Sequence, residues 1–583
     1  MSFRVEGVSV RFGQTSALKD VSCVFQPGRI TAVTGGDGAG KSTLLKLLAG
    51  AVKADLGSYR VPQKSDIGVL PTSGGVWNNL SVWENLEFVG RAYDMSPDDW
   101  QERGKKLLEY ARLHDVKERV AGHLSGGMRQ KLGFIMATLH RPRLLLLDEP
   151  TTGVDPVSRN EMWRLLTAAA AEGAAVVFST TYLDEAERAH QLLLLHEGSV
   201  IASGTPQSVL DNTPGTIYRA HRTDAPAGIF DKRDMWTRGN YVYVWTKEPG
   251  ARPPQGFSEP PLDLETASIA FLLYAQGGAA SSDASPVSRL PSRHEKTTNP
   301  LVEARNITHY FGTFTALEDV SLTVNSGEIV GLVGGNGAGK TTLLRILLGA
   351  EQPTAGECSL IGLRPSLDAR KHVGYVAQGM GLYPTLSAQE NIQFAASIFG
   401  VTVPPDFTQI TRRFEDAPVG SLPLGTQRMI SFLTANVHNP QLLVLDEPTS
   451  GMDPLRRKDL WQQMHAVCSR GAGILVTTHY MDEAIQCDRL VLLAGGRVVA
   501  EGTADRITAG LRSIVVNTPR WQRAIELLEA EGIPASLAGR TIRAPNVDAG
   551  VVLKALQLLK GDFVLHEEPS TLEEAMLTTQ HTR

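Results

Sequence analysis

The sequence predicts an α/β fold in which two similar domains with largely parallel sheets follow one another, each with a small α+β appendage. Three observations lead to this prediction. A chain of 583 residues is too long for one hydrophobic core. Long motifs of its first half return in the same order in its second half. In both halves, short apolar runs lead into glycine-rich turns and then into helical patterns.

The internal repeat covers nearly the whole chain. GGDGAGKST at residues 35–43 returns as GGNGAGKTT at 334–342, and LLLLDEPTTGVDP at 144–156 returns as LLVLDEPTSGMDP at 442–454. The two offsets are 299 and 298 residues, so the halves have nearly the same length. Each half is therefore expected to form a domain of the same kind.

Composition between the repeated motifs predicts the domain boundaries. A stretch rich in glycine, serine and proline, without apolar periodicity, indicates a flexible linker between the halves. YVYVW and RTIRA read as strands, and AIELLEAEG and GVVLKALQLL as helices, which predicts a small domain after each large one. The predicted parts are a first nucleotide-binding domain at 1–215, a small accessory domain at 216–275, the linker at 276–300, a second nucleotide-binding domain at 301–514 and a small C-terminal accessory domain at 515–583.

Composition also excludes several classes of protein. Apolar residues at 42% and charged residues at 20% are ordinary globular values. A net charge of −5 argues against a nucleic-acid partner, and the four cysteines show neither metal-ligand spacing nor a disulfide framework. The first residues lack the apolar run of a signal peptide, and no apolar run is long enough to span a membrane. A cytoplasmic protein is expected.

Two phosphate-binding loops carry the chemistry. Both copies fit the pattern G-x4-G-K-[ST] of P-loop NTPases, between an apolar strand and a helix, where backbone N–H groups surround phosphates. Lys41 and Lys340 are expected to reach the β and γ phosphates, and Ser42 and Thr341 to ligate Mg²⁺. The predicted phosphate-binding residues are Gly35, Gly36, Asp37, Gly38, Ala39, Gly40, Lys41, Ser42 and Thr43 in the first loop, and Gly334, Gly335, Asn336, Gly337, Ala338, Gly339, Lys340, Thr341 and Thr342 in the second.

A pair of carboxylates follows one apolar strand in each half. Asp148 and Glu149 end the first, and Asp446 and Glu447 end the second. Ligands of parallel sheets bind at this end of the strands. The first carboxylate of each pair suits the Mg²⁺ shell, and the second can accept a proton from an attacking water. The sequence therefore predicts ATP and Mg²⁺ as cofactors.

LSGGMRQKLGF at residues 124–134 adds a third motif. With both phosphate loops and both LDEP motifs, it makes the sequence resemble the ABC ATPase family over both halves. The resemblance implies an antiparallel sandwich in which each ATP lies between the phosphate loop of one domain and the LSGGM-type signature of the other. It places Ser125, Gly126 and Gly127 at the γ phosphate. It also marks Phe12 and Phe311 as adenine-stacking residues, an ordinary surface or core aromatic being the alternative.

The two halves differ at three positions where the resemblance expects contacts with the γ phosphate or its water. The first half has Thr72 where the second has Gln378, a further candidate Mg²⁺ ligand, and Thr181 where the second has His479. The second half has LPLGT at 422–426 in place of LSGGM, so proline replaces the serine hydroxyl, and a leucine expected to crowd the phosphate replaces glycine.

All three departures fall in the same cross-docked site. The intact site has the predicted catalytic residues Lys340, Gln378, Glu447 and His479, and joins them, with Thr341 and Asp446, to Ser125, Gly126 and Gly127. The other site joins Lys41, Ser42, Asp148 and Glu149 to Thr72, Thr181 and the LPLGT stretch. Loss of one such donor typically lowers the rate by roughly 10²- to 10³-fold, so the second of these sites is expected to bind ATP but hydrolyse it poorly.

The resemblance implies the ATPase subunit of an ABC transporter. THYMDEA and PSTLEEAML most resemble the drug and multidrug export branch, whose partners are integral-membrane permease subunits of type 2. A periplasmic or membrane adaptor is a further candidate partner, and the expected location is the cytoplasmic face of the cell (inner) membrane. Three alternatives stay open: a soluble tandem-ATPase translation factor, a tandem sugar-import ATPase, and a regulatory protein with inactive sites. The first usually has a long charged linker and the second usually lacks one loop lysine.

Overall fold

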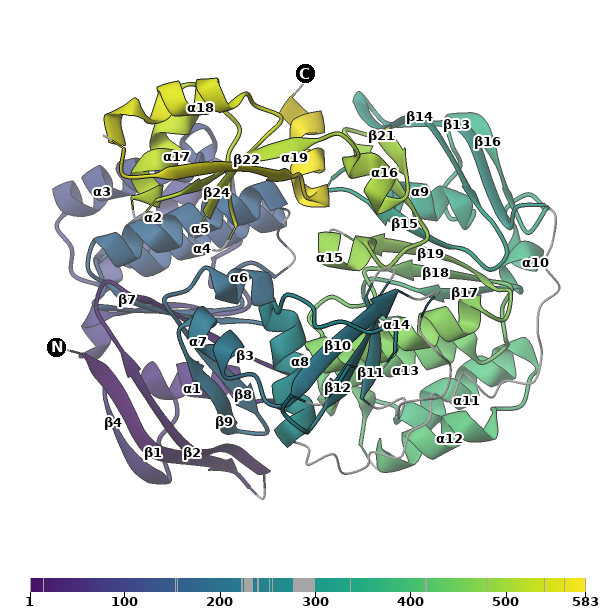
Figure 1. The fold of residues 1–583 in the computed structure, drawn as a ribbon, viewed down its shortest axis with the longest axis horizontal. Coiled ribbons are helices and arrows are strands. Elements are labelled where there is room, and N and C mark those ends of the chain that lie inside the picture. The colour runs from purple at the N-terminus through teal and green to yellow at the C-terminus, as the bar shows by residue number, and fades with distance from the viewer. Residues whose placement is uncertain are drawn as a thin grey trace.

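The computed structural model shows two large halves lying side by side, the first in purple and blue and the second in teal and green (Figure 1). Most of the predicted linker lies outside the described residues, as do Asn336 and His479. The residues that the structure describes are 2–13, 15–152, 154, 156–221, 224, 234–238, 241–250, 252–253, 255–275, 299–335, 337–414, 417–478, 480–518, 520–538, 541–559 and 561–581.

The first half is built on a six-stranded sheet of order β5-β6-β7-β3-β8-β9, in which only the β8–β9 pair is antiparallel. A second, antiparallel sheet has the order β2-β1-β4. The elements are β1 (Phe3–Phe12), β2 (Thr15–Phe25), β3 (Ile30–Gly35), α1 (Lys41–Leu48), β4 (Leu56–Arg60), β5 (Ile67–Leu70), α2 (Val82–Ala92), α3 (Pro97–Tyr110), α4 (Gly126–Thr138), β6 (Leu144–Asp148), α5 (Pro156–Ala171), β7 (Ala175–Thr180), α6 (Leu183–Glu187), β8 (Gln191–His196), β9 (Ser199–Gly204) and α7 (Pro206–Asp211).

The second half repeats this plan, with sheets of order β17-β18-β19-β15-β20-β21 and β14-β13-β16. The prediction of a largely parallel sheet in each half is therefore confirmed. The elements are β13 (Val302–Phe311), β14 (Phe314–Val324), β15 (Ile329–Val333), α9 (Lys340–Leu347), β16 (Ala355–Leu360), α10 (Leu367–Arg370), β17 (Val373–Val376), α11 (Ala388–Phe399), α12 (Pro405–Thr411), α13 (Leu424–Asn436), β18 (Leu442–Asp446), α14 (Pro454–Cys468), β19 (Gly473–Thr478), α15 (Met481–Ala484), β20 (Arg489–Ala494), β21 (Arg497–Gly502) and α16 (Ala504–Thr508).

The central strands are buried on both faces, which is why they read as unbroken apolar runs in the sequence. Every residue of β3, β7, β15, β18 and β19 is buried. Clusters of buried side chains lie on both faces of each large sheet, between the sheet and its helices. This burial stabilises the sheets and fixes the strand ends that carry the predicted site.

Each half continues into a small domain. The first has a sheet of order β10-β12-β11, from β10 (Thr216–His221), β11 (Met235–Arg238) and β12 (Tyr241–Thr246), followed by α8 (Leu264–Ala275). The second has the order β23-β24-β22-β25, from β22 (Arg512–Asn517), α17 (Trp521–Ala530), β23 (Ser536–Ala538), β24 (Thr541–Pro545), α18 (Ala549–Ala555), β25 (Val564–Pro569) and α19 (Leu572–His581). Strand β22 crosses the boundary expected between residues 514 and 515: it pairs with β25 along its whole length and with β24 from Ser513 onward.

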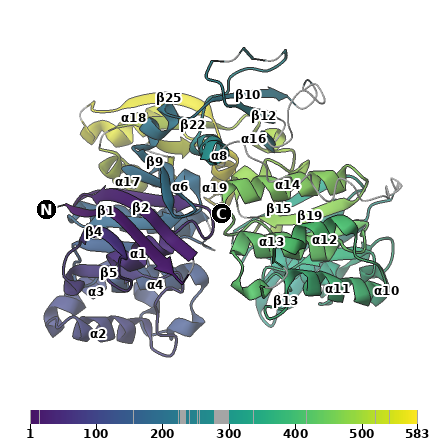
Figure 2. The same cartoon turned by 90° about the horizontal axis from the view of Figure 1, so that it is seen from below.

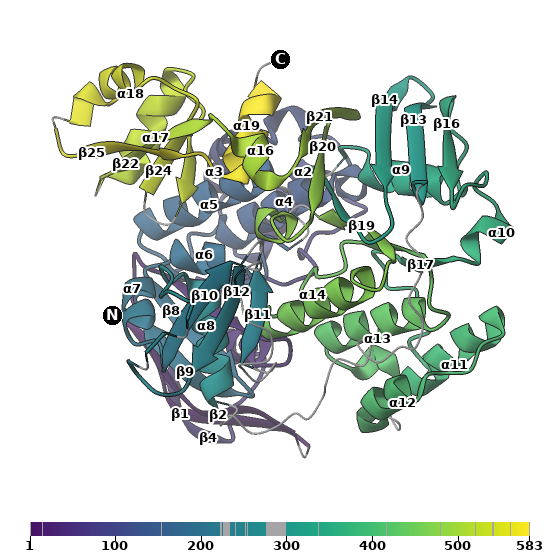
Figure 3. The same cartoon turned by 45° about the vertical axis from the view of Figure 1, so that its right-hand side comes forward.

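The first small domain packs on the opposite half. Its strands β11 and β12 and its helix α8 lie beside α14 (Figures 1 and 3). Leu455 of α14 packs against the buried cluster around Trp236 and Tyr243, and the Gln462 side-chain amide donates to the Met235 carbonyl at 3.0 Å. The first small domain therefore links the first half to the second half.

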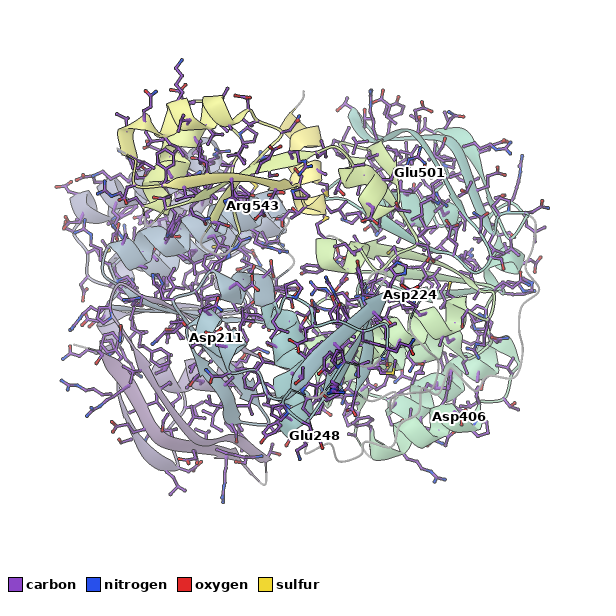
Figure 4. The ribbon with its side chains drawn as sticks, in the orientation of Figure 1. Asp211, Asp224, Glu248, Asp406, Glu501 and Arg543 are labelled. Carbon is purple, nitrogen blue, oxygen red and sulfur yellow. The ribbon has the colours of Figure 1, made fainter. Side chains whose placement is uncertain are left out.

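The second small domain lies over the first half in the same crossed manner. In Figures 1 and 3 its yellow elements lie above α5, and Figure 2 shows both small domains on the same side of the large sheets. Arg164 of α5 pairs with Glu529 of α17 at 3.0 Å. Within this domain Arg543, labelled in Figure 4, donates to Glu574, Glu568 and the Pro569 carbonyl, which ties β24 to the start of α19.

Among the described residues, no helix combines the length and the apolar character needed to cross a membrane.

Candidate functional site

Each phosphate loop joins the middle strand of its sheet to a helix, β3 to α1 and β15 to α9. Gly40 precedes α1 with a φ of 106°, which L residues rarely adopt, and a Cβ there would lie 2.6 Å from the Ala17 carbonyl oxygen. Gly339 precedes α9 with a φ of 101°. The sharp entry into each helix therefore requires glycine, and it directs the helix N-terminus toward the loop.

The loop lysines are buried and bonded within their own loops. The Lys41 ammonium donates to the carbonyl oxygens of Gly35 and Gly36 at 2.8 and 3.0 Å. Lys340 makes the corresponding two bonds in the second loop at 2.8 and 3.1 Å. Each ammonium is therefore held inside its own glycine-rich loop, the kind of loop whose N–H groups bind phosphate oxygens.

Asp148, at the end of β6, is surrounded by the hydroxyl groups of three residues. It accepts hydrogen bonds from Ser42 at 3.1 Å, from Ser179 at 2.6 Å and from Thr72 at 3.1 Å. Ser42 and Asp148 offer the oxygen ligands that Mg²⁺ prefers, so this donor set fits the ion. Thr72, the residue found in place of glutamine, binds the carboxylate at the strand end and not Glu149.

Asp446, at the end of β18, is the counterpart of Asp148 in the second half. It accepts a hydrogen bond from Thr477 at 2.6 Å, and burial raises its pKa. The side-chain nitrogen of Gln378 lies 3.5 Å from a carboxylate oxygen of Glu447. The structure thus brings together Gln378 and Glu447, while Thr341 stands at the start of α9 beside Lys340.

The second carboxylate of each pair has a strained backbone. Glu149 and Glu447 have φ values of 50° and 49°, in the left-handed region that glutamate rarely adopts. Their N–H groups donate to the hydroxyls of Ser179 at 2.9 Å and Thr477 at 3.0 Å. Burial raises the pKa of Glu149, although Lys41 lowers it in part. Such conformations are concentrated at functional sites, where the surrounding contacts hold them in place.

Ser179 and Thr477 are site residues that the sequence reasoning did not identify. Each bonds both the carboxylate and the N–H of the acidic pair in its half. The signal was present, since FSTTY and VTTHY both have a hydroxyl residue at this place, two residues before the position where one copy has threonine and the other histidine. Pairing between β6 and β7, and between β18 and β19, brings these hydroxyls to the acidic residues.

The two signature stretches begin their helices differently. Ser125 is the N-cap of α4, and its hydroxyl accepts from the Met128 N–H at 3.3 Å. Pro423 is the N-cap of α13 and makes no side-chain cap. The Leu424 side chain, expected to crowd the phosphate, lies so near Gly451 of its own half that a Cβ on that glycine would be 2.6 Å from it. What the second half lacks at this helix is the hydroxyl cap.

The first phosphate loop meets the second half's signature stretch. The Asp37 carboxylate accepts a hydrogen bond from the Leu424 N–H. A Cβ on Gly36 would lie 3.1 Å from the Asp453 carboxylate, and one on Gly38 would lie 4.0 Å from the Pro423 ring. The structure therefore joins the first loop and the LPLGT stretch across the halves, as the resemblance predicted.

The LSGGM stretch and the second loop have open space at their glycines. A Cβ added to Gly126 or to Gly337 would meet no atom of the described residues within 4 Å. Thr181, the residue in place of histidine, is buried, and its hydroxyl has no hydrogen-bond partner among the described residues.

Phe12 and Phe311 are 53% and 48% exposed at the ends of β1 and β13, so both rings are accessible for stacking.

Comparisons with known proteins agree with this geometry. Residues 18–152 and 317–450 match the ABC transporter family. The chain is 34% identical over 532 residues to the protein named "Probable multidrug ABC transporter ATP-binding protein YbhF" of Escherichia coli (strain K12), covering 85% of this chain and 91% of that protein. It is 35% identical over 292 residues to the Nod factor export ATP-binding protein I of Burkholderia lata, covering 47% of this chain and 95% of that protein.

A solved structure shares the two-domain arrangement. The archaeal ribosome recycling factor aABCE1, in complex with the stalk protein aP1, aligns with a TM-score of 0.57 over 95% of this chain and 98% of that chain, at 18% identity. At that identity the likeness concerns the fold alone. The chain belongs to the ABC transporter family, and it is an ATP-binding subunit with two ABC ATPase domains.

Proposed function

We propose that the chain is the ATP-hydrolysing subunit of an exporter of drugs or other hydrophobic compounds, with one hydrolytic site and one degenerate site. The names of the relatives support export, since one is a multidrug and the other a Nod factor export protein. Partners are integral-membrane permease subunits, and the chain lies at the cytoplasmic face of the membrane.

The observation that carries the two-site proposal is the contact between Asp37 and the Leu424 N–H. It pairs the first phosphate loop with the signature stretch that lacks the serine hydroxyl. By the same head-to-tail pairing, the second loop belongs with Ser125, Gly126 and Gly127. All three departures from the family pattern then fall in the first loop's site.

In the hydrolytic site, Glu447 accepts the proton of the attacking water, and Gln378, near its carboxylate, positions that water. Lys340 and His479 stabilise the charge on the transferring phosphoryl group. Mg²⁺, held by Thr341, Asp446 and Gln378, would neutralise phosphate charge when bound. Ser42 and Asp148 would hold the ion in the first site.

Two measurements test this function. Affinity purification of the full chain from detergent-solubilised membranes is expected to recover polytopic membrane proteins. ATP hydrolysis by that complex is expected to depend on Glu447 and far less on Glu149. Recovery of ribosomal subunits in place of membrane proteins would contradict the proposal and favour the translation-factor alternative.

A further inference from the structure

Helix α13 starts without a side-chain cap from its own half. The first N–H groups of a helix lack partners within the helix, and a side chain before the helix usually accepts from one of them. In the first half, the Ser125 hydroxyl does so for α4. Pro423 has no side-chain acceptor, and the Thr426 N–H, at the place of Met128, bonds to the Pro423 carbonyl at 3.0 Å, which leaves the Leu424 N–H to bond elsewhere.

The partner comes from the opposite half, 387 residues away in the chain. The Asp37 carboxylate accepts from the N–H of Leu424, the first residue of α13. Asp37 lies inside the first phosphate loop, and the two glycines beside it allow the close approach, since a Cβ on Gly36 would lie 3.1 Å from Asp453. Asp37 thus caps the opposite half's helix.

The Asp37 carboxylate that caps α13 is negatively charged, as a phosphate oxygen is. The N-terminus of a helix attracts anions, because its N–H groups are unpaired and its dipole is positive there. The γ phosphate of ATP would meet the same helix N-terminus in a closed site of this family. A carboxylate that already accepts a hydrogen bond from the Leu424 N–H competes with the γ phosphate for that N–H, and its negative charge repels the phosphate.

We propose that Asp37 is a specificity-determining residue of the first site. Its carboxylate joins the first phosphate loop to α13 in place of the γ phosphate, so that this site holds ADP about as tightly as ATP. The inference rests on the two-site arrangement proposed above and adds a nucleotide preference to it. The second loop has the uncharged Asn336 at the equivalent position, and its predicted partner helix α4 has its own serine cap.

The experiment isolates the first site in the full chain. Lys340→Ala removes a cation that phosphates need in the second loop, and equilibrium titrations with ATP and ADP, each with Mg²⁺, then report on the first site. The two dissociation constants are expected to agree within about threefold. Asp37→Asn in the same background is expected to tighten ATP about tenfold and to change ADP less than threefold, a difference of about 1.4 kcal/mol for ATP.

Two further variants sharpen the result. Asp94→Asn removes one exposed negative charge from the same half and is expected to leave the ratio of dissociation constants unchanged. Asp37→Ala removes the carboxylate with a different side chain and is likewise expected to raise the preference for ATP, so the proposal can be tested even if Asp37→Asn unfolds. A preference for ATP greater than about threefold in the Lys340→Ala protein, or no change in the ratio with Asp37→Asn and Asp37→Ala, overturns the proposal.

These titrations involve no hydrolysis and no membrane partner. Failure of the export proposal would therefore leave their outcome unchanged. Conversely, equal loss of hydrolysis from changes at Glu149 and Glu447 would disprove the asymmetric sites without altering the ratio of ADP to ATP affinity.

Discussion

The phenol rings of Tyr182 and Tyr480 stack across the boundary between the halves, with ring centroids 4.6 Å apart and planes inclined by 28°. Their hydroxyls share a hydrogen bond, and both rings are buried. The Arg159 guanidinium lies 5.5 and 5.3 Å from the two ring centroids, in contact with both halves. Each tyrosine directly follows the position at which the two copies differ, Thr181 in one and His479 in the other.

Hydrogen bonds and two short chain segments connect this stack to both sites. The Tyr182 N–H donates to the Thr180 hydroxyl at 3.0 Å, and Tyr480 does the same to Thr478 at 2.9 Å. The residues before these threonines, Ser179 and Thr477, bond the acidic pairs. The stack therefore joins the two chain segments whose hydroxyls bond the carboxylates.

The first prediction concerns this connection. Tyr182→Ala, in the first half, is expected to lower the turnover of the proposed hydrolytic site by about 2- to 30-fold, the range for mutations along a coupling network. Tyr480→Ala should give a similar loss, and the double variant little more than either, because both remove the same contact. Steady-state ATPase rates of the four proteins measure this. Tyr274→Ala, an exposed tyrosine on α8, is the control, and additive losses would argue against coupling through the stack.

The second prediction separates the two sites. Glu447→Gln is expected to reduce ATP hydrolysis by roughly 10²-fold or more, since it removes the proposed general base. Glu149→Gln, the matched variant in the other half, is expected to leave most of the activity. Phosphate release by the purified complex is the measurement. Equal losses from the two variants would mean that both sites hydrolyse ATP.

The third prediction tests the crossed packing of the first small domain. Leu455→Asp places a charge against the cluster that contains Trp236 and Tyr243, and burying an unpaired charge is costly. We expect faster proteolysis of the chain within residues 216–275 and a lower melting temperature. Leu553→Asp, on an exposed face of α18, is the matched control and should melt like the unmodified protein. Identical proteolysis of the two variants would show that the contact contributes little.

The fourth prediction concerns pH. Burial tends to raise the pKa of Glu328, but hydrogen bonds from Arg489 and the Asn325 N–H outweigh it and lower the pKa below its ordinary value. A carboxyl group with a lowered pKa stabilises the fold above its unfolded value of about 4.3, and this contribution is lost as the pH falls through the folded value.

Glu328→Gln is therefore expected to lower the melting temperature at pH 7 and to have a shrinking effect as the pH falls below about 4. Thermal unfolding from pH 7 to pH 3 measures this. Glu118→Gln, an exposed residue, should show no such trend. A constant difference between Glu328→Gln and the unmodified protein across this range would contradict the assigned cause.

The sequence by itself determined the repeated α/β plan, the two phosphate loops and the acidic pairs. These are local features, because a glycine-rich turn between a buried strand and a helix can form in only a few ways. The sequence reasoning also paired the first loop with LPLGT through a family resemblance, and the Asp37–Leu424 contact agrees with it.

Only the tertiary structure decided which long-range contacts complete the sites. Nothing in the sequence around Asp37 indicates that it caps a helix 387 residues away, and nothing around Tyr182 names Tyr480 as its partner. The crossed packing of the small domains likewise depends on contacts between distant surfaces. Strand pairing, too, decides that all of β22, residues on both sides of the expected boundary after residue 514, joins the small sheet. Such contacts depend on the shape and charge of two distant surfaces, which local patterns do not record.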